Sequence, residues 1–134
     1  MKKTNDGTYW ASKKLKNGQT AMMLFSLDYG WDKKPYYNVG FVVANNRKQC
    51  MRWYNGEVNS IGYRETGKGT NPKELVQFGI ETLKEFIEFM QSIKRHGEIW
   101  IEPADKKRME AYKKILAKHF DDFYYNNTAI WREI

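Results

Sequence analysis

Cysteine and histidine are the scarce reactive residues of this 134-residue chain. Cys50 is the single cysteine, and the two histidines are His96 and His119. One cysteine excludes a disulfide framework and a zinc site built from cysteines. The histidines lack the spacing of metal ligands, and no Ser/His/Asp or Cys/His arrangement for nucleophilic catalysis can be picked out. We therefore expect no metal centre and no covalent enzyme intermediate.

Long apolar runs are missing as well. No stretch approaches the roughly 18 apolar residues of a membrane helix, and the basic start MKKTNDGTYW has no apolar stretch behind it, as a signal peptide would. Low-complexity segments and internal repeats are not found either. With 41% hydrophobic and 16% aromatic residues, the chain is expected to fold as a single globular domain over residues 1–134, in the cytoplasm and without membrane contact.

Positive charge is in excess. The chain has 23 lysines and arginines against 16 aspartates and glutamates, a formal net charge of +7, and its pI is near 9.4. Such a balance favours an acidic partner: a nucleic acid, a phosphorylated cofactor or an acidic protein. Composition does not choose among these three.

The first half of the chain reads as strands. Four segments are rich in apolar, β-branched or aromatic residues and are predicted as strands: 8–15, 20–29, 36–45 and 49–54. The Asn-Gly pair in KNGQ, between the first two, is typical of a hairpin turn. The simplest assembly is an antiparallel meander without a helix.

The second half alternates helices with strands. Helical spacing of apolar residues predicts a helix over 72–93, with Asn71 as its N-cap and a His-Gly pair at its end. A short strand at 98–103, a helix over 104–120 and a closing strand in AIWREI follow. The predicted fold class is mixed α/β (α+β), a largely antiparallel sheet with two main helices in the order β-β-β-β-α-β-α-β.

A glycine-rich basic loop, YRETGKGT at residues 63–70, directly precedes the first of these helices. A helix N-terminus has unsatisfied N–H groups and a partial positive charge, so it attracts anions. Gly67 and Gly69 would let the backbone approach phosphate oxygens closely, and Arg64 and Lys68 would add charge. The loop is not a Walker loop and not a three-glycine dinucleotide fingerprint. The loop is therefore either a phosphate-binding site or an ordinary glycine-rich connection.

The spacing Arg64-x-x-Gly67-x-Gly69 before a helix resembles the acetyl-CoA pyrophosphate loop of the GCN5-related N-acetyltransferase (GNAT) family. The order long helix, strand, tyrosine-bearing helix and closing strand is similar too. The resemblance implies acetyl-CoA as cosubstrate, an amine as acceptor, and a GNAT-like fold. Because only KNGQ stands where the family usually has helices, it also implies an open acceptor side. It implies that the cofactor is held by Arg64, Glu65, Thr66, Gly67, Lys68, Gly69 and Thr70.

The same resemblance implies catalytic roles for two side chains. Tyr112 stands where the family carries a tyrosine that protonates the departing CoA thiolate, and a carboxylate would deprotonate the amine. Glu57 is our candidate base, with Glu65 and Glu102 as the other carboxylates considered. Helical periodicity also allows Tyr112 to be a core residue, and each carboxylate to be a surface charge.

Periodicity predicts the inner side of the last helix and leaves a basic outer side. The inner side would consist of Met109, Tyr112, Ile115, Leu116 and His119. The outer lysines and Arg108 suit a solvated face, the 3′-phosphate of CoA or a nucleic-acid backbone.

An alternative function belongs to a different class: a non-catalytic small basic protein of this fold that binds nucleic acid or a nucleic-acid-processing complex. The aromatic residues in 28–37 and 52–56 would then stack on bases, although cross-strand packing is the competing explanation. A structural protein that presents an apolar patch to a protein partner is a third reading. Pairing of AIWREI as an edge strand between subunits was also considered, since the sequence leaves the oligomeric state open.

Overall fold

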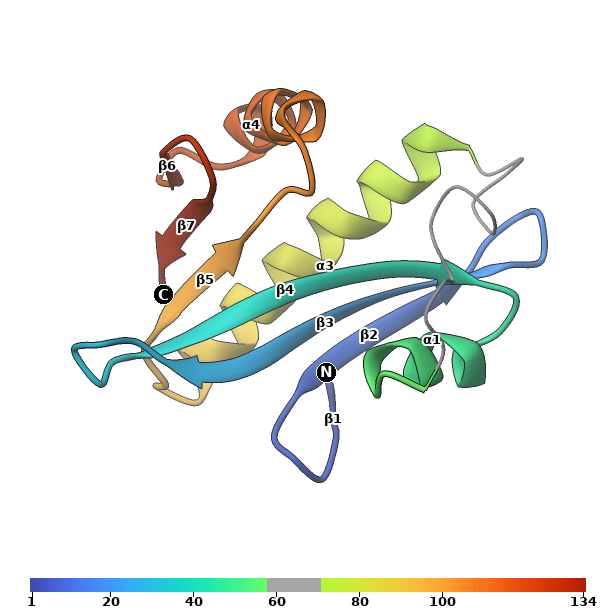
Figure 1. The fold of residues 1–134 in the computed structure, drawn as a ribbon, viewed down its shortest axis with the longest axis horizontal. Helices are drawn as coiled ribbons and strands as arrows, with labels where there is room; N and C mark the ends of the chain where they lie inside the picture. Colours follow the sequence, from blue (N-terminus) through green and yellow to red (C-terminus); the bar gives the residue numbers. More distant parts are fainter. Residues whose placement is uncertain (58–70) are drawn as a thin grey trace.

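The computed structural model describes residues 1–57 and 71–134 and is drawn in Figure 1. It confirms the predicted fold class, mixed α/β with a largely antiparallel sheet. The elements follow one another as β1 (Lys2–Lys3), β2 (Tyr9–Lys14), β3 (Thr20–Tyr29), β4 (Pro35–Ala44), α1 (Arg47–Tyr54), α3 (Pro72–Ser92), β5 (Glu98–Ile101), α4 (Lys106–His119), β6 (Tyr124–Tyr125) and β7 (Ile130–Glu133).

The strands form one sheet in the order β1-β2-β3-β4-β5-β7-β6. Strands β1 to β4 are antiparallel neighbours. Strands β2, β3 and β4 confirm three strands of the predicted meander, whereas β1 was not predicted. Strand β5 joins β4 in parallel, and β7 pairs with β5 antiparallel. AIWREI is therefore not an edge strand, as was considered, because β7 lies between β5 and β6.

The prediction of a fourth strand at 49–54 is wrong, because these residues belong to helix α1. The side chain of Asn46 caps this helix by accepting a hydrogen bond from the Gln49 backbone N–H at 2.9 Å. Cys50, Trp53 and Tyr54 have the i, i+3, i+4 spacing of a helix face and pack on the sheet. Six residues were too few to separate this spacing from strand alternation.

Helices cover both faces of the sheet (Figure 1). Helices α3 and α4 bury their apolar sides against one face, where Tyr9, Phe25 and Tyr37 lie in the main core. Helix α1 covers only part of the other face, over Met22, Leu24, Val42 and Ala44. These are alternate residues of β3 and β4, so the two faces of the same strands feed two cores.

Helix α3 matches its prediction closely at its start. Asn71 accepts a hydrogen bond from the Lys73 N–H at 2.9 Å, and Pro72 occupies the first helical turn. Eight of its residues are buried, and each large apolar side chain buried contributes about 1.5–3 kcal/mol. The helix ends at Ser92, earlier than the predicted His96–Gly97 pair. Gly97 instead passes close to the Pro35 carbonyl, where an added Cβ would lie 3.1 Å from that oxygen.

Lys94 adopts a left-handed backbone, φ 54°, just after α3. The N–H groups of Lys94 and Arg95 return to the carbonyls of Gln91 and Met90, the hydrogen-bond pattern that glycine usually closes. Replacing Lys94 by glycine is expected to raise the free energy of unfolding by about 1 kcal/mol, because the Cβ clash is removed. Urea denaturation measures this. The same change at Lys84, inside α3, should lower stability by about 1 kcal/mol, and a loss at both positions would contradict the expectation.

Helix α4 differs from its prediction in the side that it buries. Met109 and Leu116 are buried and Ile115 is partly buried, but Tyr112 and His119 are exposed. The predicted inner positions of Tyr112 and His119 are therefore wrong. The helix rotates to place Met109 and Leu116, seven residues apart, against the core.

No helix in residues 1–57 and 71–134 is both long and apolar enough to cross a bilayer.

Candidate functional site

The N-terminus of α3 lies near the carboxyl end of β4, and β5 runs in the same direction as β4 but ends beside its middle (Figure 1). This follows from the connection, because α3 carries the chain from β4 back to the parallel strand β5. Ligands of sheets with parallel strands bind outside the carboxyl ends of the strands. This end of the molecule is therefore where a ligand site is expected.

The predicted cofactor loop lies outside the described residues. This holds for Arg64, Glu65, Thr66, Gly67, Lys68, Gly69 and Thr70 alike. Their roles stay predictions, whereas the helix start that they precede is confirmed by its Asn71 cap.

Strands β4 and β5 diverge beside the middle of β4. Their parallel pairing runs from Tyr36↔Glu98 to Asn38↔Trp100 and stops, while β4 continues to Ala44. Within the described residues, no strand pairs with this edge of β4 over Val39–Phe41. These residues are half-buried, and the edge of a strand presents N–H and C=O groups that can pair with another extended segment. An extended ligand with amide groups could pair with them.

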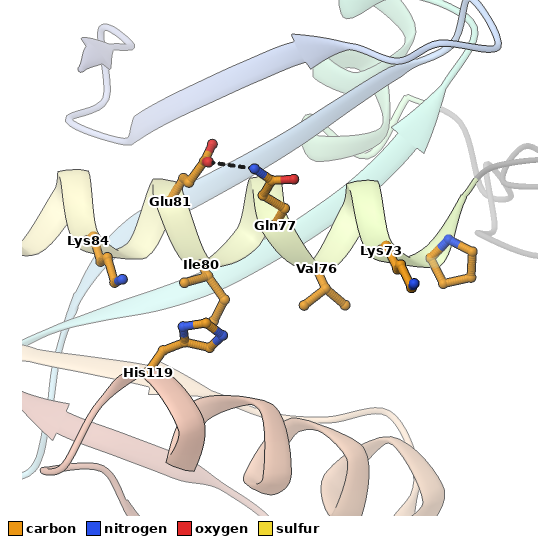
Figure 2. Close-up of a pocket in the computed structure, with 8 residues that line it drawn as sticks. Lys73, Val76, Gln77, Ile80, Glu81, Lys84 and His119 are labelled. Atoms are coloured by element: carbon orange, nitrogen blue, oxygen red, sulfur yellow. Dashed lines mark hydrogen bonds between the residues drawn. The ribbon is translucent and has the colours of Figure 1, made fainter.

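A groove of about 450 Å³ lies between α3 and α4. In Figure 2 the His119 imidazole from α4 lies against Ile80 of α3, and Lys73 and Lys84 mark the two ends of the row of α3 side chains. The Gln77 amide donates a hydrogen bond to Glu81 at 3.1 Å. The groove is lined by Pro72, Lys73, Val76, Gln77, Ile80, Glu81, Lys84 and His119.

The groove combines apolar contact with positive charge. Val76 and Ile80 supply apolar surface beside the ammonium groups of Lys73 and Lys84. The positive end of the α3 dipole adds to the charge near Lys73. This combination suits a ligand that carries both an aromatic or aliphatic part and an anionic group.

The sequence reasoning missed this groove. Its signal was present, because residues 73, 76, 77, 80 and 84 follow helical spacing on a second side of α3, beside the buried one. Val76 stands out there as an apolar residue with 37% of its surface exposed.

Tyr112 is 37% exposed on α4, so the core reading of this tyrosine is wrong. Its role as a general acid stays a prediction. Glu57 follows α1, exposed, with its carboxylate 3.6 Å from the Arg52 Nε. Because α1 and α4 pack on opposite faces of the sheet, the structure does not bring Glu57 and Tyr112 onto one face.

Glu102 directly follows β5, where β4 and β5 diverge. Its carboxylate accepts a hydrogen bond from the Trp100 indole N–H at 2.7 Å. Glu102 is therefore the candidate base that lies beside the divergence of β4 and β5. Glu57 lies after α1, and Glu65 lies outside the described residues.

The basic outer side of α4 is solvent-exposed, as one of the sequence readings expected. Arg108 pairs with Asp105 at 2.9 Å and Lys113 with Glu110 at 3.3 Å. Exposed pairs of this kind contribute about 0–1 kcal/mol each. The remaining lysines there are exposed: Lys106, Lys107, Lys114 and Lys118.

The aromatic residues of 28–37 divide into two groups. Tyr37 is buried and burial raises its pKa, whereas Tyr29 and Trp31 are exposed on the β3–β4 hairpin. Trp31 is fully exposed. The prediction of cross-strand packing is thus wrong for Trp31, because the turn at Gly30–Lys33 carries it beyond the sheet, whereas Tyr29 ends β3 opposite Pro35.

No cluster of three or more metal-ligating side chains occurs in the described parts of the chain. Cys50 is buried on the side of α1 that faces the sheet, and burial raises the pKa of its thiol to about 11. The arrangement is therefore a strand divergence, a groove with lysines at its ends and a capped helix start. Comparison of the chain with protein-family models, curated proteins and solved structures finds no match.

Proposed function

We propose that the protein binds acetyl-CoA and transfers the acetyl group to an amine, as its resemblance to the GNAT family implies. One observation carries the proposal. The parallel pairing of β4 with β5 stops at Asn38↔Trp100, and β4 continues alone to Ala44, toward the end of the sheet where α3 begins. An edge of β4 is thus left for an extended ligand beside a helix start that favours phosphate.

In this proposal each part of the cofactor has a place. Backbone groups of Thr66–Thr70 hold the pyrophosphate, with charge from Arg64 and Lys68. The pantetheine arm, which contains two amides, follows the β4 edge at Val39–Phe41. The adenosine part and its 3′-phosphate lie toward the groove that contains Lys73 and Lys84.

The reaction needs no metal and no covalent intermediate. A carboxylate takes a proton from the substrate ammonium, and the free amine attacks the thioester carbonyl carbon. The carbon–sulfur bond breaks, and the thiolate leaves with a proton that Tyr112 donates. The nitrogen loses a second proton as the amide forms, and this proton restores the Tyr112 hydroxyl. The products are an amide and CoA. Glu57 was the base expected from the sequence, and the position of Glu102 at the end of β5 favours Glu102.

The test is calorimetric binding of acetyl-CoA and CoA to the whole chain. We expect saturable binding of both, and a loss of about 10-fold or more for Gly67→Asp, since a carboxylate and a Cβ would enter the phosphate seat. Asn127→Asp adds the same charge at an exposed loop position and should leave the affinity unchanged. ATP in place of CoA checks that phosphate alone does not explain the binding.

Tyr112→Phe separates binding from chemistry. It should keep the CoA affinity and lower acetyl transfer by about 10²–10⁴, the usual contribution of a general acid. Absence of any acetyl-CoA binding would overturn the proposal, and an equal loss of affinity for the Gly67 and Asn127 variants would remove the loop from it.

A second candidate function, nucleic-acid binding, is favoured by the hairpin tip. Trp31 is fully exposed there, next to Lys33 and Lys34. A base stacked on tryptophan contributes about 1–3 kcal/mol, and lysines bind phosphates with strong salt dependence. Salt-sensitive binding of single-stranded DNA that Trp31→Ala weakens, without any CoA binding, would favour this function.

A further inference from the structure

The sheet face opposite α3 and α4 carries two rows of side chains in register across the strands. Asp28, Tyr36, Glu98 and Glu133 form one row, because each is the register partner of the next. The neighbouring row contains Ser26, Asn38, Trp100, Trp131 and Tyr124. In paired strands, register partners point to the same face. We call these two rows the aromatic–acidic face.

The aromatic members form a continuous surface. Tyr36 meets Trp100 edge-on at 6.2 Å between ring centroids, and Trp100 stacks on Trp131 at 5.4 Å. Tyr124 continues the series at 6.3 Å and is 62% exposed. Helix α1 covers the other end of this sheet face, over Met22 and Val42. Among the described elements, no helix packs over the tryptophans.

The acidic members include one like-charge pair and two carboxylates that accept hydrogen bonds. Glu98 and Glu133 are directly opposite one another, a like-charge arrangement that destabilises a strand pair. Glu102 adds a third carboxylate at the Trp100 indole, and Asp28 a fourth, which accepts the Tyr36 hydroxyl at 3.1 Å. None of these four carboxylates forms an ion pair within residues 1–57 and 71–134.

This lack of cations is notable in a chain of net charge +7. Arg132, which lies in β7 between Trp131 and Glu133, points to the other face and pairs with Asp122 at 3.1 Å. The four carboxylates of this face thus have no cationic partner within 4.0 Å in residues 1–57 and 71–134. The unpaired like charges of Glu98 and Glu133 oppose stability, and such an arrangement is typical of a binding surface.

We propose that the aromatic–acidic face binds a small aliphatic amine with two or more positive charges. The carboxylates attract the ammonium groups, and the rings of Trp100 and Trp131 contact the methylenes and the cations. Strands lie about 4.8 Å apart, so successive carboxylates of the row present a spaced series of charges to a linear polyamine. The proposal rests on the proposed function, in which this amine is the acetyl acceptor.

The position of the face fits that role. Asn38 and Trp100 are the last register pair before β4 and β5 diverge, and both belong to this face. An amine lying over Trp100 would place one nitrogen beside the divergence, where the thioester would emerge along β4. Glu102, at the same indole, would accept its proton. A nucleic acid does not suit this face, since its phosphates would meet the carboxylates.

The experiment is calorimetric titration of the whole protein with spermidine, without acetyl-CoA. We expect saturable binding, and about 10-fold weaker binding for Glu98→Gln combined with Glu133→Gln. This double change removes a repulsion, so the variant should fold at least as stably as the parent. Glu88→Gln, which removes one carboxylate from an exposed site of α3, should have no effect. Trp131→Leu should weaken spermidine about 3-fold or more, and butylamine, with one charge, should bind at least 10-fold more weakly.

The outcomes separate this inference from the proposed function. Acetyl-CoA binding without spermidine binding overturns the inference and leaves the proposed function standing. Spermidine binding that requires Glu98 and Glu133, without acetyl-CoA binding, supports the amine site and overturns acetyl transfer. Equal losses for the Glu88 and the Glu98/Glu133 variants, or binding of an oligolysine peptide that spermidine does not displace, overturn the small-amine site.

Discussion

Replacing Phe86 by alanine is expected to lower the free energy of unfolding by about 3–5 kcal/mol, the usual range for a buried phenylalanine. Phe86 is fully buried and lies where α3 meets three strands. Its ring stacks on Phe25 at 3.9 Å and meets Tyr37 at 5.3 Å and Tyr9 at 5.9 Å. The truncation would leave a cavity that these large rings cannot easily fill, which adds to the lost apolar burial.

Urea denaturation followed by circular dichroism measures this effect. Phe120→Ala is the matched control, because Phe120 is only partly buried at the end of α4, and it should cost clearly less. A domain of this size has a stability of about 5–15 kcal/mol, so Phe86→Ala takes away a large share of it. A loss below 1 kcal/mol would show that the α3 interface is not packed as described.

The Cys50 thiol is expected to resist alkylation in the folded protein at pH 8 and to react on unfolding. Cys50 is fully buried on the side of α1 that faces the sheet, with its thiol 3.7 Å from the Thr20 carbonyl. Burial raises the pKa of this thiol from 9.0 to about 11. Because only the thiolate attacks, each pKa unit above the pH lowers the reactive fraction about 10-fold. Labelling with iodoacetamide in buffer and in urea, followed by mass spectrometry, measures the contrast. Similar rates in both solvents would contradict the burial.

The same pKa shift gives a pH dependence of stability with a definite sign. The folded protein holds the Cys50 proton more tightly than the unfolded chain does. Its contribution is therefore complete below pH 9 and is lost as the pH rises toward 11, by about 2–3 kcal/mol at most. Cys50→Ala should show a smaller fall in the free energy of unfolding between pH 8 and pH 10.5. The comparison of the two proteins cancels the titration of lysines and tyrosines, and parallel curves would contradict the expectation.

Local signals in the sequence were sufficient for the elements that they governed. Asn71 and Pro72 placed the start of α3 correctly, because a cap and a fixed φ act within one turn. The apolar run of β3 gave its observed bounds, Thr20–Tyr29. The segment of α1 is short enough to fit helical and strand periodicity equally well. Only the packing of Cys50 against the sheet shows that it is a helix.

The candidate site was predictable only in part. The loop motif and the helix that follows it are contiguous, so their relation is visible in the chain. The groove at His119 and the pairing of Glu98 with Glu133 depend on segments far apart in sequence. The orientation of Tyr112 depends on the rotation of α4, which Met109 and Leu116 determine through their burial. Periodicity gives a helix its sides, but tertiary packing selects the buried one.

The three-residue pairing of β4 with β5 also has a consequence for the order of folding. Strands β2 to β4 are joined by short hairpins and can associate early, because little chain entropy is lost in closing them. The β4–β5 contact closes a much longer loop and forms few backbone hydrogen bonds in return. We expect amide hydrogens of β5 and β7 to exchange sooner than those of β3. The pairing of β4 with β5 would then be the last part of the sheet to form and the first to open.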